Sequence, residues 1–279
     1  MTITVHRLTY YPVKGCAGTT VDSAHVLGTG LEHDRTFMVV DAVDGAFRSQ
    51  RTHPAMAAVR VGVLDGGAAL DLSAEDIEPL RLDVDPDGPR REVSMFDRPL
   101  GEAVDQGDEI AEWFSDVLGA KSRLVRVAPG FDRDGWGDTP GKVNFADAHA
   151  VLIASTASLD DLNARITAGG DASPVPMDRF RPNIVLTGDD EPHFEDRVRR
   201  MTIGSVELAH SVRAMRCAVP MVDQATGHRA GPEPIRTLST YRREPEYGNK
   251  VSFGAKNAVV CEGVVSVGDT VEVAEWLDA

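Results

Sequence analysis

Short runs in which apolar and polar residues alternate dominate both halves of the chain. Such alternation is typical of half-buried strands. In the first half it predicts strands at 3–8, 36–41, 59–64 and 68–72. Asp65-Gly66-Gly67 separates the last two runs, and a hairpin is expected there because glycine supplies the positive φ of a tight turn. In the second half the runs predict strands at 183–186, 201–208, 257–261 and 270–273.

Helical periodicity appears in only two places. Apolar residues between 110 and 118 fall on one face, which predicts a helix with its cap at Asp108 and its end at Gly119. A second helix is expected after Ser155, with Leu159, Leu162 and Ile166 on one face. Residues 128–145 are rich in Gly, Asp and Pro and predict a long loop, a candidate for part of a site wall. Many short strands with few helices predict a mainly β protein with some helix and barrel-like sheets.

Composition narrows the classes of partner. The chain has 279 residues, enough for one large domain or two modest ones, and a formal charge of −15. An acidic surface repels phosphate, so neither nucleic acid nor an anionic membrane is an expected partner. Three cysteines give no disulfide framework and favour a reducing compartment. With short apolar runs and no signal-peptide core at the N-terminus, we expect a cytoplasmic protein.

Cys217 is the first candidate for chemistry. Arg213 and Arg216 precede it, and positive charge near a thiol favours the thiolate. A thiolate can ligate a soft metal or attack an electrophile, and the alternative is a buried cysteine that follows a strand. Anion-binding candidates are scattered along the chain, and a solvated turn or a surface salt bridge explains each one taken singly. They are Lys14, Gly15, Arg35, Arg51, Arg179, Arg181 and Asn183.

Taken in order, several stretches resemble the MOSC-domain family, in the form with an N-terminal β-barrel domain that includes the mitochondrial amidoxime-reducing components and bacterial relatives. The stretches are YYPVKGCAG (10–18), GLEHDRTFMVVD (30–41), SQRTHP (49–54), ASTASLDDLN (154–163), RFRPNIVL (179–186), RCAVPMVDQATG (216–227), EPIRTLSTYRR (233–243), FGAKNAVV (253–260) and VGDTVEV (267–273). The resemblance implies a β-barrel-like N-terminal domain at 1–122 and a MOSC β-barrel domain at 123–279.

The resemblance also implies a molybdenum cofactor bound as molybdopterin. The family's metal-ligand cysteine falls on Cys217. The residues expected to hold the pterin and its phosphate are Lys14, Gly15, Arg35, Arg51, Ser155, Thr156, Arg181, Asn183 and Arg216. Helix-start hydroxyls and amides bind anions, which fits Ser155 and Thr156. Three positions depart from the family pattern: Gly15 stands where relatives often have Ser, Met215 replaces a small polar residue, and Lys256 falls where the mitochondrial proteins have Tyr.

From this resemblance we expect an oxidoreductase that converts small N-hydroxylated substrates from N–OH to N–H. No flavin, haem or cluster motif is visible in the sequence, so an external electron-transfer protein and a reductase are the expected partners. The alternative is a cofactor carrier, or a sulfur-transfer protein with a persulfide on Cys217. A member that has lost metal binding is the third reading, and the joint retention of Lys14, Arg35, Arg181 and Cys217 argues against it.

Overall fold

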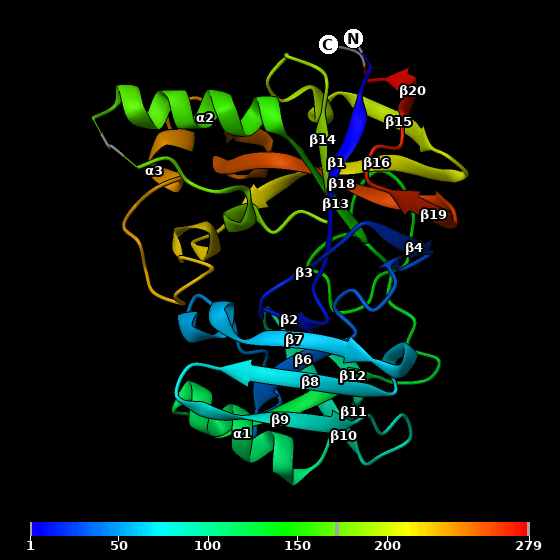
Figure 1. Cartoon of the computed structure of the whole chain (residues 1–279), viewed down its shortest axis with the longest axis vertical. Helices are drawn as coiled ribbons and strands as arrows, with labels where there is room; N and C mark the ends of the chain where they lie inside the picture. Colours follow the sequence, from blue (N-terminus) through cyan, green and yellow to red (C-terminus); the bar gives the residue numbers. More distant parts are fainter. Residues whose placement is uncertain (1, 171–172, 278–279) are drawn as a thin grey trace.

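The computed structural model describes residues 2–170 and 173–277. It has two lobes stacked along the long axis (Figure 1). The upper lobe holds a nine-stranded sheet and helices α2 and α3, and the lower lobe holds α1 with a five-stranded and a three-stranded sheet. The mainly β class with some helix is confirmed. In the described part of the chain the sheets run as open paths of paired strands, so the predicted barrels are not closed by hydrogen bonds.

The nine-stranded sheet combines strands from both ends of the chain. Its order is β20-β15-β16-β18-β13-β14-β1-β3, with β17 paired to β18. The strands are β1 (Thr4–Tyr10), β3 (Thr19–Val21), β13 (Val151–Ser155), β14 (Ile184–Thr187), β15 (Val198–Ile203), β16 (Val206–Arg216), β17 (Arg243–Glu244), β18 (Lys250–Cys261) and β20 (Val271–Trp276). A three-stranded sheet adjoins it, made of β19 (Gly263–Ser266), β4 (Ser23–Leu27) and β5 (Gly30–Leu31). Because β1 pairs with β14 and β4 with β19, these strands from the start of the chain belong to the upper lobe.

The lower lobe is built from β2 and from the strands that follow β5, up to β12. Its five-stranded sheet has the order β10-β11-β12-β6-β2, and its three-stranded sheet the order β7-β8-β9. The strands are β2 (Val13–Lys14), β6 (Phe37–Asp41), β7 (Arg60–Leu64), β8 (Ala69–Ala74), β9 (Ile77–Asp83), β10 (Arg90–Met95), β11 (Arg98–Asp105) and β12 (Ser122–Val127). Phe114 of α1 (Asp108–Leu118) is fully buried in one core with Val39 and Leu70.

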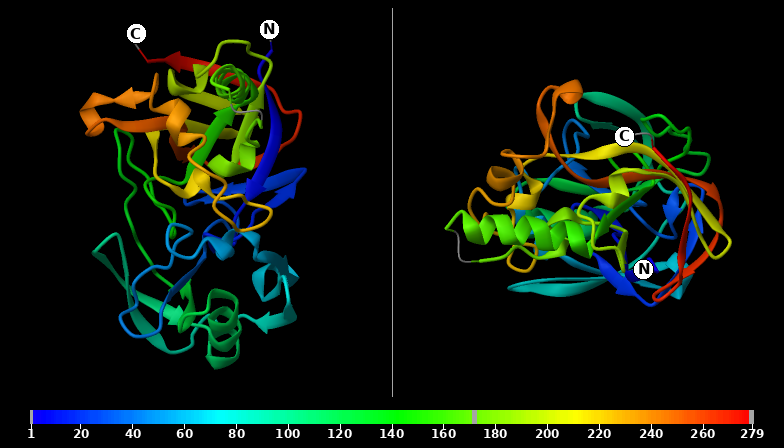
Figure 2. Two further views of the ribbon diagram at one scale, coloured as in Figure 1. Left: turned by 90° about the vertical axis from the view of Figure 1, so that its left-hand side faces the viewer. Right: turned by 90° about the horizontal axis from the view of Figure 1, so that it is seen from above.

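The remaining helices flank the upper sheet. Helix α2 (Thr156–Ala168) lies across the upper lobe in Figure 1, and Figure 2 shows it end on in the left view and side on from above. Its Leu162 and Ile166 are buried with Phe253 of β18, and its Leu159 is partly buried beside them. The others are α3 (Ile235–Leu238) and the 3-10 helices η1 (Pro54–Ala58), η2 (Asp65–Gly67), η3 (Met177–Phe180), η4 (Phe194–Asp196), η5 (Val219–Met221) and η6 (Pro245–Tyr247). No helix among the described residues is long and apolar enough to cross a membrane.

Two element predictions are wrong in detail. The strand expected at 201–208 is broken by a turn, because Gly204 takes a left-handed φ of 59° that ends β15 and starts β16. The cap of α1 is Gly107, with a φ of 92°, and Asp108 is already helical. Gly119 ends the helix in the left-handed conformation, as predicted.

The long loop between the lobes is confirmed. Residues 128–145 contain one isolated bridge, Asp134 to Lys142, as their only strand-type pairing among described residues. The loop leaves β12 in the lower lobe and returns the chain to β13 in the upper lobe.

Candidate functional site

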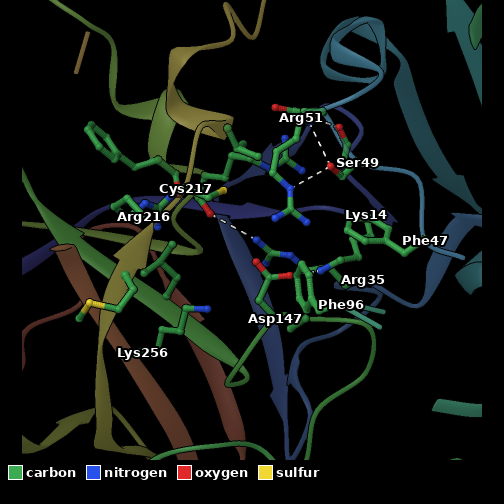
Figure 3. A pocket seen from close by; sticks show the side chains of 18 of the residues that line it. Lys14, Arg35, Phe47, Ser49, Arg51, Phe96, Asp147, Arg216, Cys217 and Lys256 are labelled. Carbon is green, nitrogen blue, oxygen red and sulfur yellow. Dashed lines mark hydrogen bonds and ion pairs between the residues drawn. The ribbon is translucent and has the colours of Figure 1, made fainter. Parts of the chain in front are cut away.

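A cavity lies where the two lobes meet (Figure 3). It encloses about 860 Å³ of space between its lining atoms, including open solvent at its mouth. The lower lobe supplies Lys14 from β2, Ser49 and Arg51 from the segment after β6, and Phe96 from the turn between β10 and β11. The upper lobe supplies Leu152 from β13, Asn183 from just before β14, Arg216 from the end of β16 and Lys256 from the middle of β18.

Cys217 is the one cysteine of the three that lines the cavity. It follows the last residue of β16, and Pro220 in η5 cannot continue the strand ladder because it has no N–H. The thiol side chain is exposed in the cavity. Cys16 is buried, and burial raises the pKa of its thiol to about 12, so it is inert by comparison. Cys261 is exposed at the end of β18, outside the cavity lining.

Only one of the two arginines before the thiol reaches the cavity. Arg213 donates to Glu244 over 2.7 Å and is outside the lining. Arg216 does line the cavity; the β16–β18 pairing has an irregularity between Arg213 and Met215, so simple strand alternation does not relate the two arginines. Its Nη2 donates to the Phe180 carbonyl over 2.8 Å, while its Nε is buried and has no partner. Burial lowers the pKa of Arg216 from its ordinary value, opposed by the nearby Cys217.

Arg35 and Arg181 are held against one aromatic ring. Their guanidinium carbons lie 4.4 and 4.2 Å from the ring centre of Tyr11. Tyr11 is buried and donates to the Pro182 carbonyl over 3.1 Å. Both arginines have positive φ, at 47° and 57°, a conformation that long side chains adopt only where the surroundings impose it. The sequence analysis missed Tyr11, whose only signal was its place two residues before Val13-Lys14.

Arg35 is also fixed by polar contacts. It pairs with Asp34, and its Nη2 donates to the Arg181 carbonyl over 3.3 Å. Its Nη1 donates to Asn183 Oδ1 over 3.0 Å. The other contacts of the Asn183 amide go to Leu152, Thr9 and Asp34, so Asn183 acts on the cavity by orienting Arg35.

Lys14 and Asp147 form an ion pair at the centre of the site. Burial lowers the pKa of Lys14, while Asp147 partly offsets this effect. Burial alone would raise the pKa of Asp147, but Lys14 and Lys256 hold it well below its usual range, so Asp147 is ionised. Lys14 Nζ also lies 4.9 Å from the centre of the Phe47 ring. Asp147 was missed because it follows a polar loop that contains several other aspartates.

Gly15 makes a close backbone approach beside Lys14. Its φ is 89°, and a Cβ there would meet the Met56 methyl carbon at 2.9 Å. Gln50 Nε2 donates to the Gly15 carbonyl over 2.6 Å. A serine at this position would be strained in its backbone.

Arg51 and Arg181 complete the cationic wall. The Nε of Arg51 donates to Ser49 Oγ over 3.2 Å, and its guanidinium lies 5.0 Å from the centre of the Phe96 ring. Arg181 donates to the Cys16 carbonyl over 2.6 Å and to Gln224 Oε1 over 3.1 Å. Arg179, the remaining candidate, pairs with Asp223 and is outside the lining.

The structure brings eight of the ten proposed site residues together in the cavity lining and leaves two outside it. The eight are Lys14, Gly15, Arg35, Arg51, Arg181, Asn183, Arg216 and Cys217. Ser155 and Thr156 are the other two. Ser155 Oγ accepts from the Ser158 N–H as the cap of α2 and donates to Glu195 over 2.9 Å. Thr156 donates to Thr187 over 3.0 Å, so both hydroxyls are used by the scaffold.

The described residues contain no cluster of metal-ligating side chains. Nowhere in 2–170 or 173–277 do three or more His, Cys, Asp or Glu side chains gather where they could hold a metal ion.

The chain matches two protein-family models and is similar in sequence to several known proteins. Residues 2–121 match the family described as MOSC N-terminal beta barrel domain, and residues 140–272 match the MOSC domain. The chain is 31% identical to mitochondrial amidoxime-reducing component 1 of Mus musculus, over 96% of this chain and 81% of the relative. It is 30% identical to mitochondrial amidoxime reducing component 2 of Bos taurus, over 96% and 82%. It is also 30% identical to a molybdenum cofactor sulfurase of Oryza sativa subsp. japonica, over 88% of this chain; it spans only 31% of that relative's length.

Proposed function

The chain belongs to the MOSC family, in the form that joins an N-terminal MOSC β-barrel domain to a MOSC domain, and from this membership we propose that it is a molybdenum-cofactor enzyme that reduces N-hydroxylated compounds. Relatives named for amidoxime reduction cover most of the chain, which supports this substrate class. The observation that carries the proposal is a single exposed thiol, Cys217, in a cavity lined by six cations and one carboxylate. The cations are Lys14, Arg35, Arg51, Arg181, Arg216 and Lys256, and the carboxylate is Asp147.

The residues present fit a molybdopterin. An excess of positive charge suits its phosphate, because guanidinium groups bind phosphate oxygens in pairs. The buried Nε of Arg216 has no partner, so it is free to bind an anion. The thiolate of Cys217 is a soft ligand of the kind that a molybdenum centre takes from protein.

When bound, the cofactor supplies the two-electron reduction that cleaves the N–O bond. The protein's part is binding, orientation and control of charge. Arg35 and Arg181 are held against Tyr11 and, with Lys14, would hold the anionic end of the pterin. Phe47 and Phe96 pack edge to face at 5.9 Å beside the Lys14 amine. The electrons come from an external electron-transfer protein and its reductase.

The test is turnover with a chemical donor in place of the natural one. The chain is expressed in a host that makes the cofactor, reduced with a viologen dye and given benzamidoxime, and benzamidine is measured by chromatography. We expect turnover by the wild type and by Cys261→Ser, and loss of more than 99% of it in Cys217→Ser. A cofactor-loaded wild type that reduces no amidoxime, hydroxylamine or N-hydroxylated base contradicts the proposal.

A sulfur-transfer or cofactor-carrier role is the second candidate. The exposed thiol of Cys217 favours it, because a persulfide must be reached by its acceptor. The similarity to a molybdenum cofactor sulfurase over 88% of this chain also favours it. Cyanide releases thiocyanate from a persulfide, so thiocyanate release from the wild type but not from Cys217→Ser supports this second role.

A further inference from the structure

Lys256 differs from the other cations of the cavity. Its backbone lies in the middle of β18, opposite Leu152 of β13 on one side and Val212 of β16 on the other. Its side chain enters the cavity with its amino end directed toward Asp147 (Figure 3). Each of the other five cations has a hydrogen bond or ion pair to the protein. Among the described residues Lys256 Nζ has none, so all three of its N–H groups are available to a ligand.

Reduction of an N-hydroxyl group consumes protons as well as electrons. For a hydroxylamine the balance is R–NH–OH + 2e⁻ + 2H⁺ → R–NH₂ + H₂O. The N–O bond breaks, the oxygen leaves as water and the nitrogen takes a hydrogen. A side chain fixed in the cavity beside the substrate can deliver the proton to the leaving oxygen faster than bulk water can.

The other side chains that line the cavity are poorly suited to donate this proton to the leaving oxygen. Lys14 is paired with Asp147, and Asp147 is ionised and has no proton to give. His149 accepts from the Ala150 N–H at Nδ1 over 3.1 Å, and its Nε2 lies 3.0 Å from the Thr139 carbonyl and donates to it. Arginines keep their protons at neutral pH.

We propose that Lys256 is the general acid of the reaction: its Nζ donates a proton to the oxygen that leaves when the N–O bond is cleaved. This inference rests on the proposed function. The two electrons come from the external electron-transfer protein. The second proton reaches the nitrogen from water, and water at the cavity mouth returns the proton to Nζ after each turnover.

The charges around Lys256 suit this role. Burial lowers the pKa of Lys256 to about 8, Asp147 opposes this effect, and the positive charges of Arg216, Lys14 and Arg35 add to it. His149 also faces it, and burial lowers the pKa of His149 so that the ring is neutral near pH 7. A general acid is most effective when its pKa lies near the working pH, and such a group contributes about 10²–10⁴-fold to rate.

The decisive variant is Lys256→Arg, which keeps the positive charge but cannot give up the proton. Lys256→Met removes both the charge and the proton. Lys250→Arg is the control, because Lys250 is exposed at the start of β18. With metal and pterin contents like wild type, we expect kcat to fall about 100-fold or more in Lys256→Arg and Lys256→Met, with KM within about threefold. In the wild type kcat falls as pH rises above the pKa of Lys256, and this decline is absent from Lys256→Met. A Lys256→Arg protein with wild-type kcat overturns the inference, because charge alone then suffices.

A second measurement, the titration of the Lys256 amine, does not depend on enzyme turnover. The chain has only five lysines, so their ¹³C-methylated amines can be followed by NMR, with the Lys256 signal identified by its loss in Lys256→Arg. We expect this amine to titrate near pH 8 in cofactor-free protein and at a higher pH after loading, because an anion favours the charged amine. Titration near the ordinary lysine value in the cofactor-free protein overturns the inference. A loaded wild type without any reductase activity overturns the proposed function and this inference together, whereas an active Lys256→Arg overturns this inference alone.

Discussion

Arg35 Nη1 donates a hydrogen bond to Asn183 Oδ1 over 3.0 Å, across 148 positions of sequence. Asn183 precedes β14 in the upper lobe, and Arg35 precedes β6 in the lower lobe. The same amide bonds the Leu152 N–H, the Thr9 carbonyl and Asp34, so both its oxygen and its nitrogen are fully used. One buried amide therefore sets the direction of an arginine in the cavity.

The substitution Asn183→Ala removes the hydrogen bond that orients the Arg35 side chain. Because it leaves several buried polar groups unsatisfied, we expect a loss of about 2–4 kcal/mol in the free energy of unfolding, with pterin content reduced at least tenfold. The control is Asn163→Ala, because Asn163 makes two comparable bonds to Val175 far from the cavity. Denaturant unfolding and pterin fluorescence check both variants. Wild-type pterin content in a folded Asn183→Ala protein would show that Arg35 needs no such support.

Lys14 and Arg181 are expected to hold the anionic end of the cofactor. Each charge-assisted contact to a phosphate contributes about 1.5–3 kcal/mol, so Lys14→Met and Arg181→Met should each weaken pterin binding by about tenfold or more. Lys142→Met is the matched control, because Lys142 is exposed and pairs with Asp132 and Asp134 in the loop. The measurement is pterin released per chain. Equal pterin in all three variants would place the phosphate elsewhere.

Ser155→Ala and Thr156→Val test the two proposed site residues that lie outside the cavity. Ser155 caps α2, and loss of such a cap costs about 1 kcal/mol of stability. We expect a lower melting temperature for Ser155→Ala, and metal and pterin contents like those of the wild type for both variants. Loss of cofactor from a stable Thr156→Val protein would restore the phosphate role that the resemblance implies.

The buried carboxyl of Glu195 makes stability depend on pH. Burial, with the adjacent negative charge of Asp196, raises the pKa of Glu195 to about 7. The folded chain therefore binds more protons than the unfolded chain between about pH 4.5 and 7, and the contribution of this group to the free energy of unfolding falls as pH rises through that window. Glu195→Gln should lose this slope and exceed the wild type in stability above pH 7, while the exposed Glu112→Gln should keep it. Urea unfolding at several pH values checks this, and an unchanged slope in Glu195→Gln would contradict it.

Local patterns predicted the elements better than they predicted their partners. The helices α1 and α2 follow from apolar periodicity within a single window. The pairing of β1 with β14 does not, because antiparallel pairing between distant segments leaves no local signal. The turn at Gly204 was missed for a similar reason: the apolar pattern continues through it, and only the backbone conformation reveals the break.

The residues that line the cavity likewise divide into those with a recognisable sequence signal and those without one. Cys217 and the arginines were found because their side chains carry chemistry and stand in recognisable stretches. Tyr11, Phe47, Phe96 and Asp147 were missed because an aromatic residue or an aspartate in a turn is ordinary until the fold brings it beside a cation. Ser155 and Thr156 looked suitable because a helix start binds anions, yet this helix start faces Glu195.

The most direct test is the molybdenum and pterin content of purified protein from a host that makes the cofactor. Wild type and Cys261→Ser should each contain about one molybdenum and one pterin per chain. Cys217→Ser should keep pterin, because the cationic contacts remain, and should lose all reduction of benzamidoxime. A folded wild type that contains neither molybdenum nor pterin would contradict the assignment of this cavity to a molybdenum cofactor.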